Sequence, residues 1–485
     1  MNGYPAGMTY ETDGAAPPEE PARQLFFIRK CEALINKRSE ELERPLCYFI
    51  QTFGCQMNER DSEKLAGVMG QMGLIPAPSE DKADILLYNT CTVRENADKR
   101  LYGRLGVCKA YKQENRDMLI ALCGCMMQEE HVIDRIKSSY PYVDIIFGTH
   151  NIYRFAELLY SRLTSDSCVR EIWKDASDIV EELPALRKYP FKTGINIMYG
   201  CNNFCTYCIV PYVRGRERSR EPGDIIREIE KAAADGVVEI MLLGQNVNSY
   251  GRGLDTDIGF PELLSMAAEA DGIKRVRFMT SHPKDLSDEL IKTIAEHENI
   301  ARHIHLPLQS GSDRILEAMN RHYTRERYID LAKKIRDAIP DVSITTDIIV
   351  GFPGETVRDV EDTLDVIEQV RFDGAFTFEY SPRKGTPAAG MEQLDKAFVQ
   401  ENFDRVLSAV QRISKEQAGR FEGRRMEVLT EGEDEKDPSR YTGRISQNNV
   451  VHFPKSGLRV GDFAEVQLDE CRGFYYNGTV VAPQT

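Results

Sequence analysis

The sequence of 485 residues contains no run of about 18 apolar residues, the length that a helix needs to cross a bilayer. Its first residues, MNGYPAGMTYETDGAAPPEEPARQ, lack the basic start and apolar stretch of a secretory signal, so we expect a cytoplasmic protein. Basic residues are also in deficit: 62 Lys and Arg against 77 Asp and Glu give a net charge of −15. That balance argues against generic nucleic-acid binding, and any RNA contact must use local basic patches.

Cysteines are few as well. Twelve in a chain this long are too sparse for a disulfide scaffold, so cysteines that occur in groups suggest metal or redox chemistry. The length suggests about three domains of roughly 150 residues each. Composition divides the chain into an acidic, partly disordered extension that ends in a helix (1–44), an N-terminal domain (45–165), a central domain (187–417) and a C-terminal domain (418–483).

Three apolar, strand-like runs in the N-terminal domain each end in a cysteine and lead into a helix-like segment. CYFIQTFGC ends at Cys55, DILLYNTC ends at Cys91 and LIALCGC ends at Cys125. Strands that alternate with helices predict a parallel α/β sheet, in which ligands gather outside the carboxyl ends of the strands. We therefore expect these three cysteines to converge on one point.

The central domain repeats this alternation in longer units. The expected strands are GINIMYG, EIMLLGQNV, RVRFMT, HIHLPLQ, SITTDIIVG and GAFTFEYS, which begin at residues 194, 239, 275, 303, 343 and 374. Six strand–helix units predict a partial (β/α)6 barrel, similar to a TIM barrel, with its active site at the carboxyl-terminal face. A long helix is expected over about 394–420, and the short strands that follow predict a small antiparallel, OB-like barrel.

A second cysteine group, in CNNFCTYC, follows the first strand of the central domain and contains Cys201, Cys205 and Cys208. Three thiolates on one tight loop can bind three irons of a 4Fe–4S cluster and leave the fourth iron open. The alternative is a zinc site that lacks its fourth ligand, but zinc sites usually combine closely spaced cysteine pairs with partners further along the chain. The spacing therefore favours a cluster with one open iron.

This cysteine motif resembles that of the radical-SAM superfamily. In that superfamily the open iron binds S-adenosylmethionine, and an electron from the cluster cleaves it to a 5′-deoxyadenosyl radical. The resemblance assigns several side chains at the strand ends to S-adenosylmethionine: Tyr207, Gln245, Gln309, Ser310, Asp347 and, as an alternative to a phosphate contact, Arg220. His282, in TSHPKD, either faces substrate or has a structural role.

The surroundings of the first three cysteines, TFGCQMNERDS, NTCTVRENAD and CGCMMQ, resemble the N-terminal domain of the methylthiotransferases. The resemblance implies a second 4Fe–4S cluster on Cys55, Cys91 and Cys125, whose open iron carries the sulfur to be inserted. Cys123 is interpreted as a spectator, because the motif aligns with Cys125 instead. The other cysteines are interpreted as ordinary thiols: Cys31, Cys47, Cys108, Cys168 and Cys471.

The order of a methylthiotransferase domain, a radical-SAM domain and a TRAM-like RNA-binding domain resembles the methylthiotransferase family over nearly all of the chain after about residue 45. LLGQNVNSYG, SHPKD and FEYSPRKGTPAA are most similar to the branch that acts on N(6)-isopentenyladenosine at tRNA position 37. This implies insertion of sulfur and a methyl group at carbon 2, with S-adenosylmethionine as both methyl donor and radical source. The alternatives are the branches that modify threonylcarbamoyl-adenosine in tRNA or a ribosomal-protein aspartate, and a non-catalytic RNA-binding iron–sulfur sensor.

The strongest local basic patch is RGRERSR, directly after the second cysteine group. We predict that Arg214, Arg216 and Arg218 contact RNA phosphates at the mouth of the site, and that Arg383 adds to this patch. A solvated basic loop is the alternative. The resemblance also implies a sulfur donor and a reductant such as flavodoxin or ferredoxin. We expect a monomer that does not bind membranes.

Overall fold

The computed structural model describes residues 14–92, 95–165, 167–174 and 179–481, and the chain forms two compact units. The N-terminal unit extends to Lys188 and also includes Ile209–Gly215. The second unit comprises Tyr189–Cys208 and the chain from Arg216 onward. Segment 209–215 therefore belongs to the N-terminal unit, although the sequence places it inside the predicted central domain.

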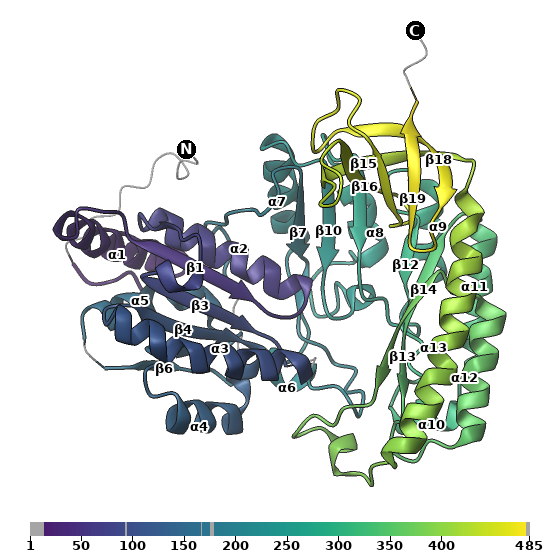
Figure 1. The fold of residues 1–485 in the computed structure, drawn as a ribbon, viewed down its shortest axis with the longest axis horizontal. Coiled ribbons are helices and arrows are strands. Elements are labelled where there is room, and N and C mark those ends of the chain that lie inside the picture. Colours follow the sequence, from purple (N-terminus) through teal and green to yellow (C-terminus); the bar gives the residue numbers. More distant parts are fainter. Residues whose placement is uncertain (1–13, 93–94, 166, 175–178, 482–485) are drawn as a thin grey trace. The chain divides into compact units, whose positions relative to one another are not determined.

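The N-terminal unit is a parallel sheet with helices on both faces (Figure 1). The strands pair in the order β2-β1-β3-β4-β5-β6 and every pair is parallel, which confirms the predicted α/β sheet. The elements are α1 (Ala22–Glu41), β1 (Cys47–Thr52), α2 (Gln56–Gln71), β2 (Ile75–Pro76), β3 (Ile85–Thr90), α3 (Glu95–Glu114), β4 (Leu119–Gly124), α4 (Glu130–Ser139), β5 (Ile145–Phe147), α5 (Phe155–Leu163), β6 (Val169–Glu171) and α6 (Val210–Arg214).

Strand β3 explains the two helical layers, because all of its residues are buried. Ile85 and Leu87 pack in the core under α1, α2 and α5, whereas Leu86 and Tyr88 pack in the core under α3 and α4. Successive side chains of a strand point to opposite faces, so an unbroken apolar run requires cover on both sides. Helix α1 matches the helix expected at the end of the N-terminal extension, and it packs into the first of these cores. Residues 1–13 of the predicted disordered extension lie outside the described residues.

The second unit begins with an open barrel of six parallel strands, which begin at the predicted residues except that β7 begins two residues earlier. They form two sheets, β7-β10-β11 and β12-β13-β14, and a parallel bridge from Val276 to Ile300 connects β11 to the segment before β12. The elements are β7 (Lys192–Asn196), β8 (Met198–Tyr199), β9 (Arg218–Ser219), α7 (Pro222–Ala234), β10 (Glu239–Leu243), α8 (Phe260–Ala268), β11 (Arg275–Phe278), α9 (Asp288–Glu296), β12 (His303–His305), α10 (Asp313–Ala318), α11 (Arg325–Ala338), β13 (Ser343–Val350), α12 (Val357–Val370), β14 (Gly374–Glu379) and α13 (Lys396–Ala418).

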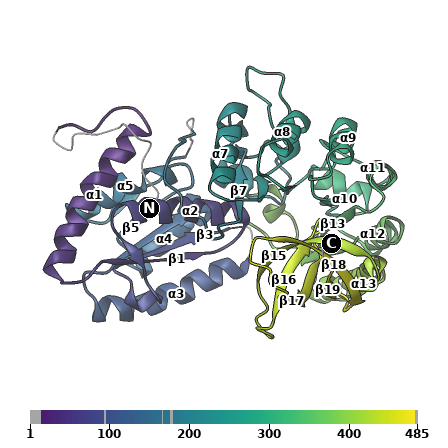
Figure 2. The same ribbon diagram turned by 90° about the horizontal axis from the view of Figure 1, so that it is seen from above.

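The chain ends in a closed five-stranded barrel, in the order β15-β16-β17-β19-β18 (Figure 2). Its strands are β15 (Arg425–Glu433), β16 (Arg440–Ile445), β17 (Val450–Pro454), β18 (Phe463–Cys471) and β19 (Tyr475–Val480). The predicted barrel is confirmed, but β17 and β19 run parallel rather than antiparallel. A closed ring with an odd number of strands cannot alternate in direction throughout, so one neighbouring pair must be parallel. Within the described residues, no helix is both long and apolar enough to cross a membrane.

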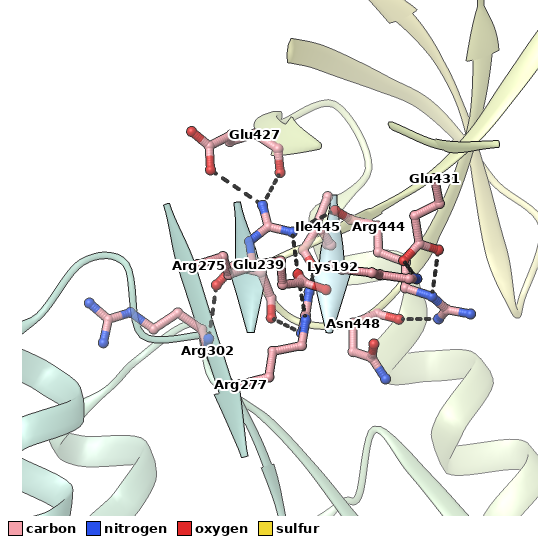
Figure 3. Close-up of polar contacts among 11 residues, drawn as sticks. Lys192, Glu239, Arg275, Arg277, Arg302, Glu427, Glu431, Arg444, Ile445 and Asn448 are labelled. Atoms are coloured by element: carbon pink, nitrogen blue, oxygen red, sulfur yellow. Dashed lines mark hydrogen bonds and ion pairs between the residues drawn. The ribbon is translucent and has the colours of Figure 1, made fainter. Parts of the chain in front are cut away.

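Buried arginines at the start of β11 join the two barrels of the second unit (Figure 3). Arg277 donates to the Glu239 carboxylate (2.9 Å) and to the carbonyl oxygen of Ile445 (2.9 Å), and Arg275 donates to the carbonyl oxygen of Arg444 (2.9 Å). These contacts lie at the amino-terminal ends of the parallel strands. The C-terminal barrel therefore covers the end of the open barrel that is opposite to the carboxyl ends of its strands.

We expect the substitution Arg277→Met to destabilise this interface by about 3 kcal/mol, because removing one partner of a buried ion pair leaves the other partner uncompensated. Glu239 would keep only a longer contact of 3.6 Å to Arg275. Hydrogen exchange of the β15–β19 amides, followed by mass spectrometry, measures the local stability. The control is Arg412→Met, which removes an exposed ion pair with Glu368 and should cost less than about 1 kcal/mol. Equal losses in the two variants would contradict the buried role of Arg277.

Candidate active site

Three cysteines of the N-terminal unit lie at the carboxyl ends of adjacent strands. Cys55 follows β1, Cys91 follows β3 and Cys125 follows β4, and β3 pairs with both of the other strands. Cys91 and Cys125 are buried, whereas Cys55 at the start of α2 is exposed. Cys123 instead packs in the core on one face of the sheet. The structure thus brings the three cysteines that were grouped from the sequence to one edge of the sheet.

Two glycines let the strand ends approach one another this closely. Gly54 and Gly124 both have positive φ values, 113° and 95°. A Cβ atom on Gly54 would lie 2.4 Å from the Cβ of Cys91, and one on Gly124 would lie 2.4 Å from the carbonyl oxygen of Thr90. A side chain at either position would therefore push neighbouring strand ends apart, in addition to straining the backbone.

Buried asparagines bind the strand ends together. The side-chain amide of Asn58, in the first turn of α2, donates to the carbonyl oxygens of Phe53 (2.9 Å) and Thr90 (2.8 Å). The amide of Asn89, in β3, donates back to the carbonyl oxygen of Asn58 (2.8 Å) and to the Ser62 hydroxyl (3.0 Å). The sequence analysis did not single out these residues. The available signal was the polar run NERDS, residues 58–62, which is unusual for a helix that starts against a buried edge.

Arg214 also lies in this network and not on the surface. Its Nη2 donates to Oδ1 of Asn58 (2.7 Å) and lies 3.3 Å from the Asp61 carboxylate. Burial by itself lowers the pKa of Arg214, but the charges of Cys125, Asp61 and Cys55 together raise it above its ordinary value. In turn, burial raises the pKa of the Cys125 thiol to about 12, and Arg214 opposes that rise. The guanidinium of Arg214 is buried beside the cysteines, which argues against the RNA contact predicted for it.

The other cysteine group lies on the loop after β7 and β8, and the segment after α10 holds that loop. The Asn320 amide donates to the carbonyl oxygens of Asn203 and Phe204, each at 3.1 Å. The Thr206 hydroxyl donates to the carbonyl oxygen of Ala318 (2.8 Å). Cys201 and Cys205 are buried and Cys208 is half-buried, and burial raises the pKa of Cys201 to about 11.

A buried arginine accompanies this cysteine group as well. Nη1 of Arg321 lies 3.5 Å from the Cys205 sulfur and 3.5 Å from the Tyr207 hydroxyl, while Nη2 donates to the carbonyl oxygen of Pro307 (3.0 Å). Lys284 reaches the same loop and donates to the Asn203 side chain. The sequence analysis missed Arg321, Lys284 and Asn320, since no periodic pattern distinguishes a charged loop residue that turns inward.

Most of the other residues that were assigned to S-adenosylmethionine lie on or after β10, β12 and β13. Gln245 follows β10, Gln309 and Ser310 follow β12, and Asp347 lies in β13. Gln309 has a φ of 68°, and its N–H donates to the carbonyl oxygen of Asp347 (2.8 Å). The Asp347 carboxylate lies 3.3 Å from Nε2 of His305. These side chains therefore share the carboxyl end of the open barrel with the cysteine loop.

His282, at the end of β11, has structural contacts. Its Nδ1 accepts the N–H of Lys284 (3.3 Å), its own N–H donates to Asn246 (3.3 Å), and its ring packs edge-on against Tyr323 at 5.8 Å. Burial lowers the pKa of His282 far below its ordinary value. These contacts favour the structural alternative for His282.

Two phenylalanines on the inner face of the open barrel were also not expected. Phe376 pairs with Asp347 and Phe378 pairs with Ile349 across β13 and β14, so both point to the same face as Asp347. The alternate residue Ile348 packs in the core beneath the helices. Phe376 is 58% exposed and Phe378 is 39% exposed. The open barrel thus offers an uncovered aromatic surface beside the proposed S-adenosylmethionine residues.

The strand ends carry cysteine sulfurs that could bind iron and buried oxygen atoms that could bind a polar cofactor. Among the residues that the structure describes, no three His, Cys, Asp or Glu side chains come close enough to hold a single metal ion. A zinc site needs that convergence, whereas each thiolate on a 4Fe–4S cluster binds its own iron. In the described part of the chain, two buried oxygens at strand ends have no hydrogen-bond partner: Oδ1 of Asn196, the last residue of β7, and Oγ of Ser281, which follows β11. Three cysteines at each site therefore suit a 4Fe–4S cluster, and the buried oxygens without a partner suit a polar cofactor.

The other predicted basic residues have different surroundings. The guanidinium groups of Arg216 and Arg218 lie over aromatic rings, 4.3 and 5.9 Å from the ring centroids. Arg220 is buried and forms an ion pair with Glu228 (2.7 Å). Arg383 is half-buried in the segment after β14. Arg216 is thus the most accessible of these side chains.

Three parts of the chain match known families. Residues 47–148 match the family described as uncharacterized protein family UPF0004, residues 195–367 match the radical SAM superfamily, and residues 419–481 match the TRAM domain. In fold, the chain is similar to the radical S-adenosylmethionine methyltransferase TsrM from Kitasatospora setae, solved with cobalamin and a [4Fe-4S] cluster bound. The TM-score is 0.51, with 13% identity, over 71% of this chain and 74% of that chain.

Curated relatives match over almost the entire length. A tRNA-2-methylthio-N(6)-dimethylallyladenosine synthase from Lachnoclostridium phytofermentans is 54% identical, over 93% of this chain and 99% of its own length. A relative of the same name from Alkaliphilus oremlandii is 52% identical, over 96% of this chain and 98% of its own length. With such identity along the chain, and with both cysteine groups at the carboxyl ends of parallel strands, the chain belongs to the family of tRNA-2-methylthio-N(6)-dimethylallyladenosine synthases within the radical SAM superfamily.

Proposed function

We propose that the protein is a tRNA methylthiotransferase, which adds sulfur and a methyl group at carbon 2 of N(6)-isopentenyladenosine at tRNA position 37. The observation that carries this proposal is the pair of three-cysteine sites, one in each unit, at the carboxyl ends of parallel strands. A radical enzyme needs one such site, and a second site suits an enzyme that also inserts another group. The names of the relatives and the order of the three family matches support the same function.

The loop with Cys201, Cys205 and Cys208 would hold a 4Fe–4S cluster, which supplies the electron that cleaves S-adenosylmethionine. The chain's own part is to position that loop, and its contacts with Asn320 and Arg321 support this role. We propose that S-adenosylmethionine is bound by Tyr207 on this loop and by residues on or after the barrel strands: Gln245, Gln309, Ser310, Asp347 and Arg220.

The edge with Cys55, Cys91 and Cys125 would hold a second 4Fe–4S cluster. The asparagines Asn58 and Asn89 fix the three strand ends and thereby the spacing of the sulfur atoms. The sulfur donor and a reductant such as flavodoxin or ferredoxin would come from outside the chain. We propose that the protein works as a monomer.

RNA binding by this acidic chain must rely on a few basic side chains. Arg216, Arg218 and Arg383 remain candidates for phosphate contacts, which supply affinity and orientation rather than sequence recognition. Planar guanidinium groups stacked on rings are already oriented, as for Arg216 over Phe204, so they lose little freedom when they bind a phosphate. A base that is splayed out of the anticodon loop could then enter the open barrel.

The aromatic surface of β14 suits the isopentenyl group of the proposed substrate. That group is a branched, uncharged five-carbon chain, and an exposed phenyl ring gains free energy when such a chain covers it. A threonylcarbamoyl group carries a carboxylate, which gains nothing from the rings of Phe376 and Phe378 and would lose hydration there. The two phenylalanines therefore favour the isopentenylated substrate over the threonylcarbamoylated one.

The two-cluster proposal can be tested by counting irons after anaerobic reconstitution. The unsubstituted protein should hold about eight irons per chain. Replacing Cys55, Cys91 and Cys125 together by Ala should leave about four irons and intact 5′-deoxyadenosine formation, but no methylthiolated tRNA. Replacing Cys201, Cys205 and Cys208 should also leave about four irons, and 5′-deoxyadenosine formation should be lost.

The matched control replaces three half-buried cysteines outside both sites, Cys47, Cys168 and Cys471, and should retain all eight irons. A count of about four irons in the unsubstituted protein would rule out the second cluster. If 5′-deoxyadenosine forms while isopentenylated tRNA is not methylthiolated, the enzyme acts on a different substrate.

Substrate discrimination tests the role of β14. Phe376→Ala and Phe378→Ala should each raise KM for an isopentenylated anticodon stem-loop about tenfold, since each removes an apolar contact worth roughly 1.4 kcal/mol. The measurement compares kcat/KM for isopentenylated and unmodified stem-loops. Phe474, 81% exposed between β18 and β19, provides the control, because Phe474→Ala should leave this ratio unchanged. If the ratio is unchanged in both β14 variants, Phe376 and Phe378 do not contribute to substrate specificity.

A further inference from the structure

Arg214 is unusual because it reaches the N-terminal unit from a distant part of the sequence. It ends α6, which belongs to segment 209–215 and directly follows Cys208 in the sequence. Within the N-terminal unit, Ile209 and Val213 of this segment pack against Cys125, and the Thr149 hydroxyl donates to the carbonyl oxygen of Val213 (2.6 Å). These contacts fix the backbone that carries Arg214.

The guanidinium of Arg214 is held in one orientation. Only 6% of the residue is exposed, and its Nη2 is shared between Asn58 (2.7 Å) and Asp61 (3.3 Å). Asn58 also donates to the carbonyl oxygens of Phe53 and Thr90. The guanidinium is therefore fixed relative to the backbone that precedes Cys55 and Cys91. Burying a charged group is costly unless it is paired, and among the described non-cysteine residues Asp61 is the negative partner of Arg214.

The remaining negative charge around Arg214 comes from the cysteines. Asp61 already neutralises the guanidinium, so the edge as a whole is negative when its three cysteines are ionised. A further anionic sulfur would be repelled from such an edge unless a fixed positive charge lay next to it. Arg214 is the guanidinium whose charge acts on both Cys125 and Cys55.

We propose that Arg214 is a positioning residue of the Cys55–Cys91–Cys125 site, which attracts an anionic sulfur species, hydrosulfide, to the cluster and raises the cluster's reduction potential. This inference rests on the proposed function, because it requires a cluster at these cysteines. An N–H donor beside a cysteine sulfur and a nearby positive charge both favour the reduced, more negative form of a cluster. The same charge stabilises a bound anion at a coordination position of the cluster.

The experiment uses the full-length chain with Cys201, Cys205 and Cys208 replaced by Ala, so that only the N-terminal site can hold iron. In this background, Arg214→Met removes the charge and keeps an apolar side chain of similar length. We expect hydrosulfide to bind about tenfold more weakly, as followed by the cluster's absorption and electron paramagnetic resonance spectra. The midpoint potential should fall by about 59 mV, which corresponds to a tenfold shift in a one-electron equilibrium.

Further variants separate charge from structure. Arg214→Lys should restore most of both values, because it keeps the positive charge. Arg154→Met is the matched control, since it removes an arginine of the same unit that pairs with Glu157 and Glu171. It should change neither the potential nor hydrosulfide binding. If the Met variant does not retain iron, Arg214→Gln replaces it, because it also lacks the charge. Its hydrosulfide affinity and midpoint potential are then compared with those of the parent.

The outcomes distinguish this inference from the proposed function. About four irons per chain, with the same potential and hydrosulfide affinity in the parent and in the charge-removing variant, would overturn the role of Arg214. Failure of the Lys variant to restore either value, with iron retained, would show a purely structural role and would also overturn it. If the parent background itself binds no iron, the second cluster is absent and the proposed function fails instead.

Discussion

Both candidate sites depend on the same constraint, that neighbouring parallel strands end at one edge of a sheet. At that edge the backbone must turn at once into a helix or loop, and a residue placed there is near the equivalent residues of the adjacent strands. In the N-terminal unit the turns are close enough that Gly54 and Gly124 have no room for a side chain. The cysteines that follow these glycines can therefore share one ligand, which they could not do from the middle of their strands.

The two sites also solve the same electrostatic problem in the same way. When the three cysteines of a site are ionised they concentrate negative charge in a poorly solvated place, and each site includes a buried arginine beside a cysteine. Arg214 acts on Cys125, and Arg321 lies 3.5 Å from Cys205. In each case an asparagine nearby holds the backbone, Asn58 in one site and Asn320 in the other. In each site, therefore, an arginine compensates the charge of the cysteines and a nearby asparagine fixes the backbone that carries them.

The sequence predicted the strands and the cysteine positions because both have local signals. Alternating and continuous apolar runs indicate which strand faces are buried. The six barrel strands begin where those runs predicted them, apart from a small shift in β7. The role of Arg214 had no local signal. RGRERSR has the composition of an exposed basic loop, and only the tertiary packing of α6 turns its first arginine inward. The sequence analysis missed four other residues for a related reason. Asn320 and Arg321 contact a loop that is distant in the sequence, and Phe376 and Phe378 are distinguished by the face of the sheet on which they lie.

The attachment of the C-terminal barrel adds a constraint on how RNA can be bound by the second unit. Arg275 and Arg277 fix that barrel to the amino-terminal ends of the parallel strands, whereas the cysteine loop lies at their carboxyl ends. Strand β13 has eight residues, and a strand rises about 3.3 Å per residue, so the two ends lie roughly 26 Å apart. An isolated nucleoside cannot reach both ends, but a folded RNA arm can. If the base enters the open barrel, as we propose, contacts at the C-terminal barrel can add to affinity only for a substrate that is presented within a larger RNA.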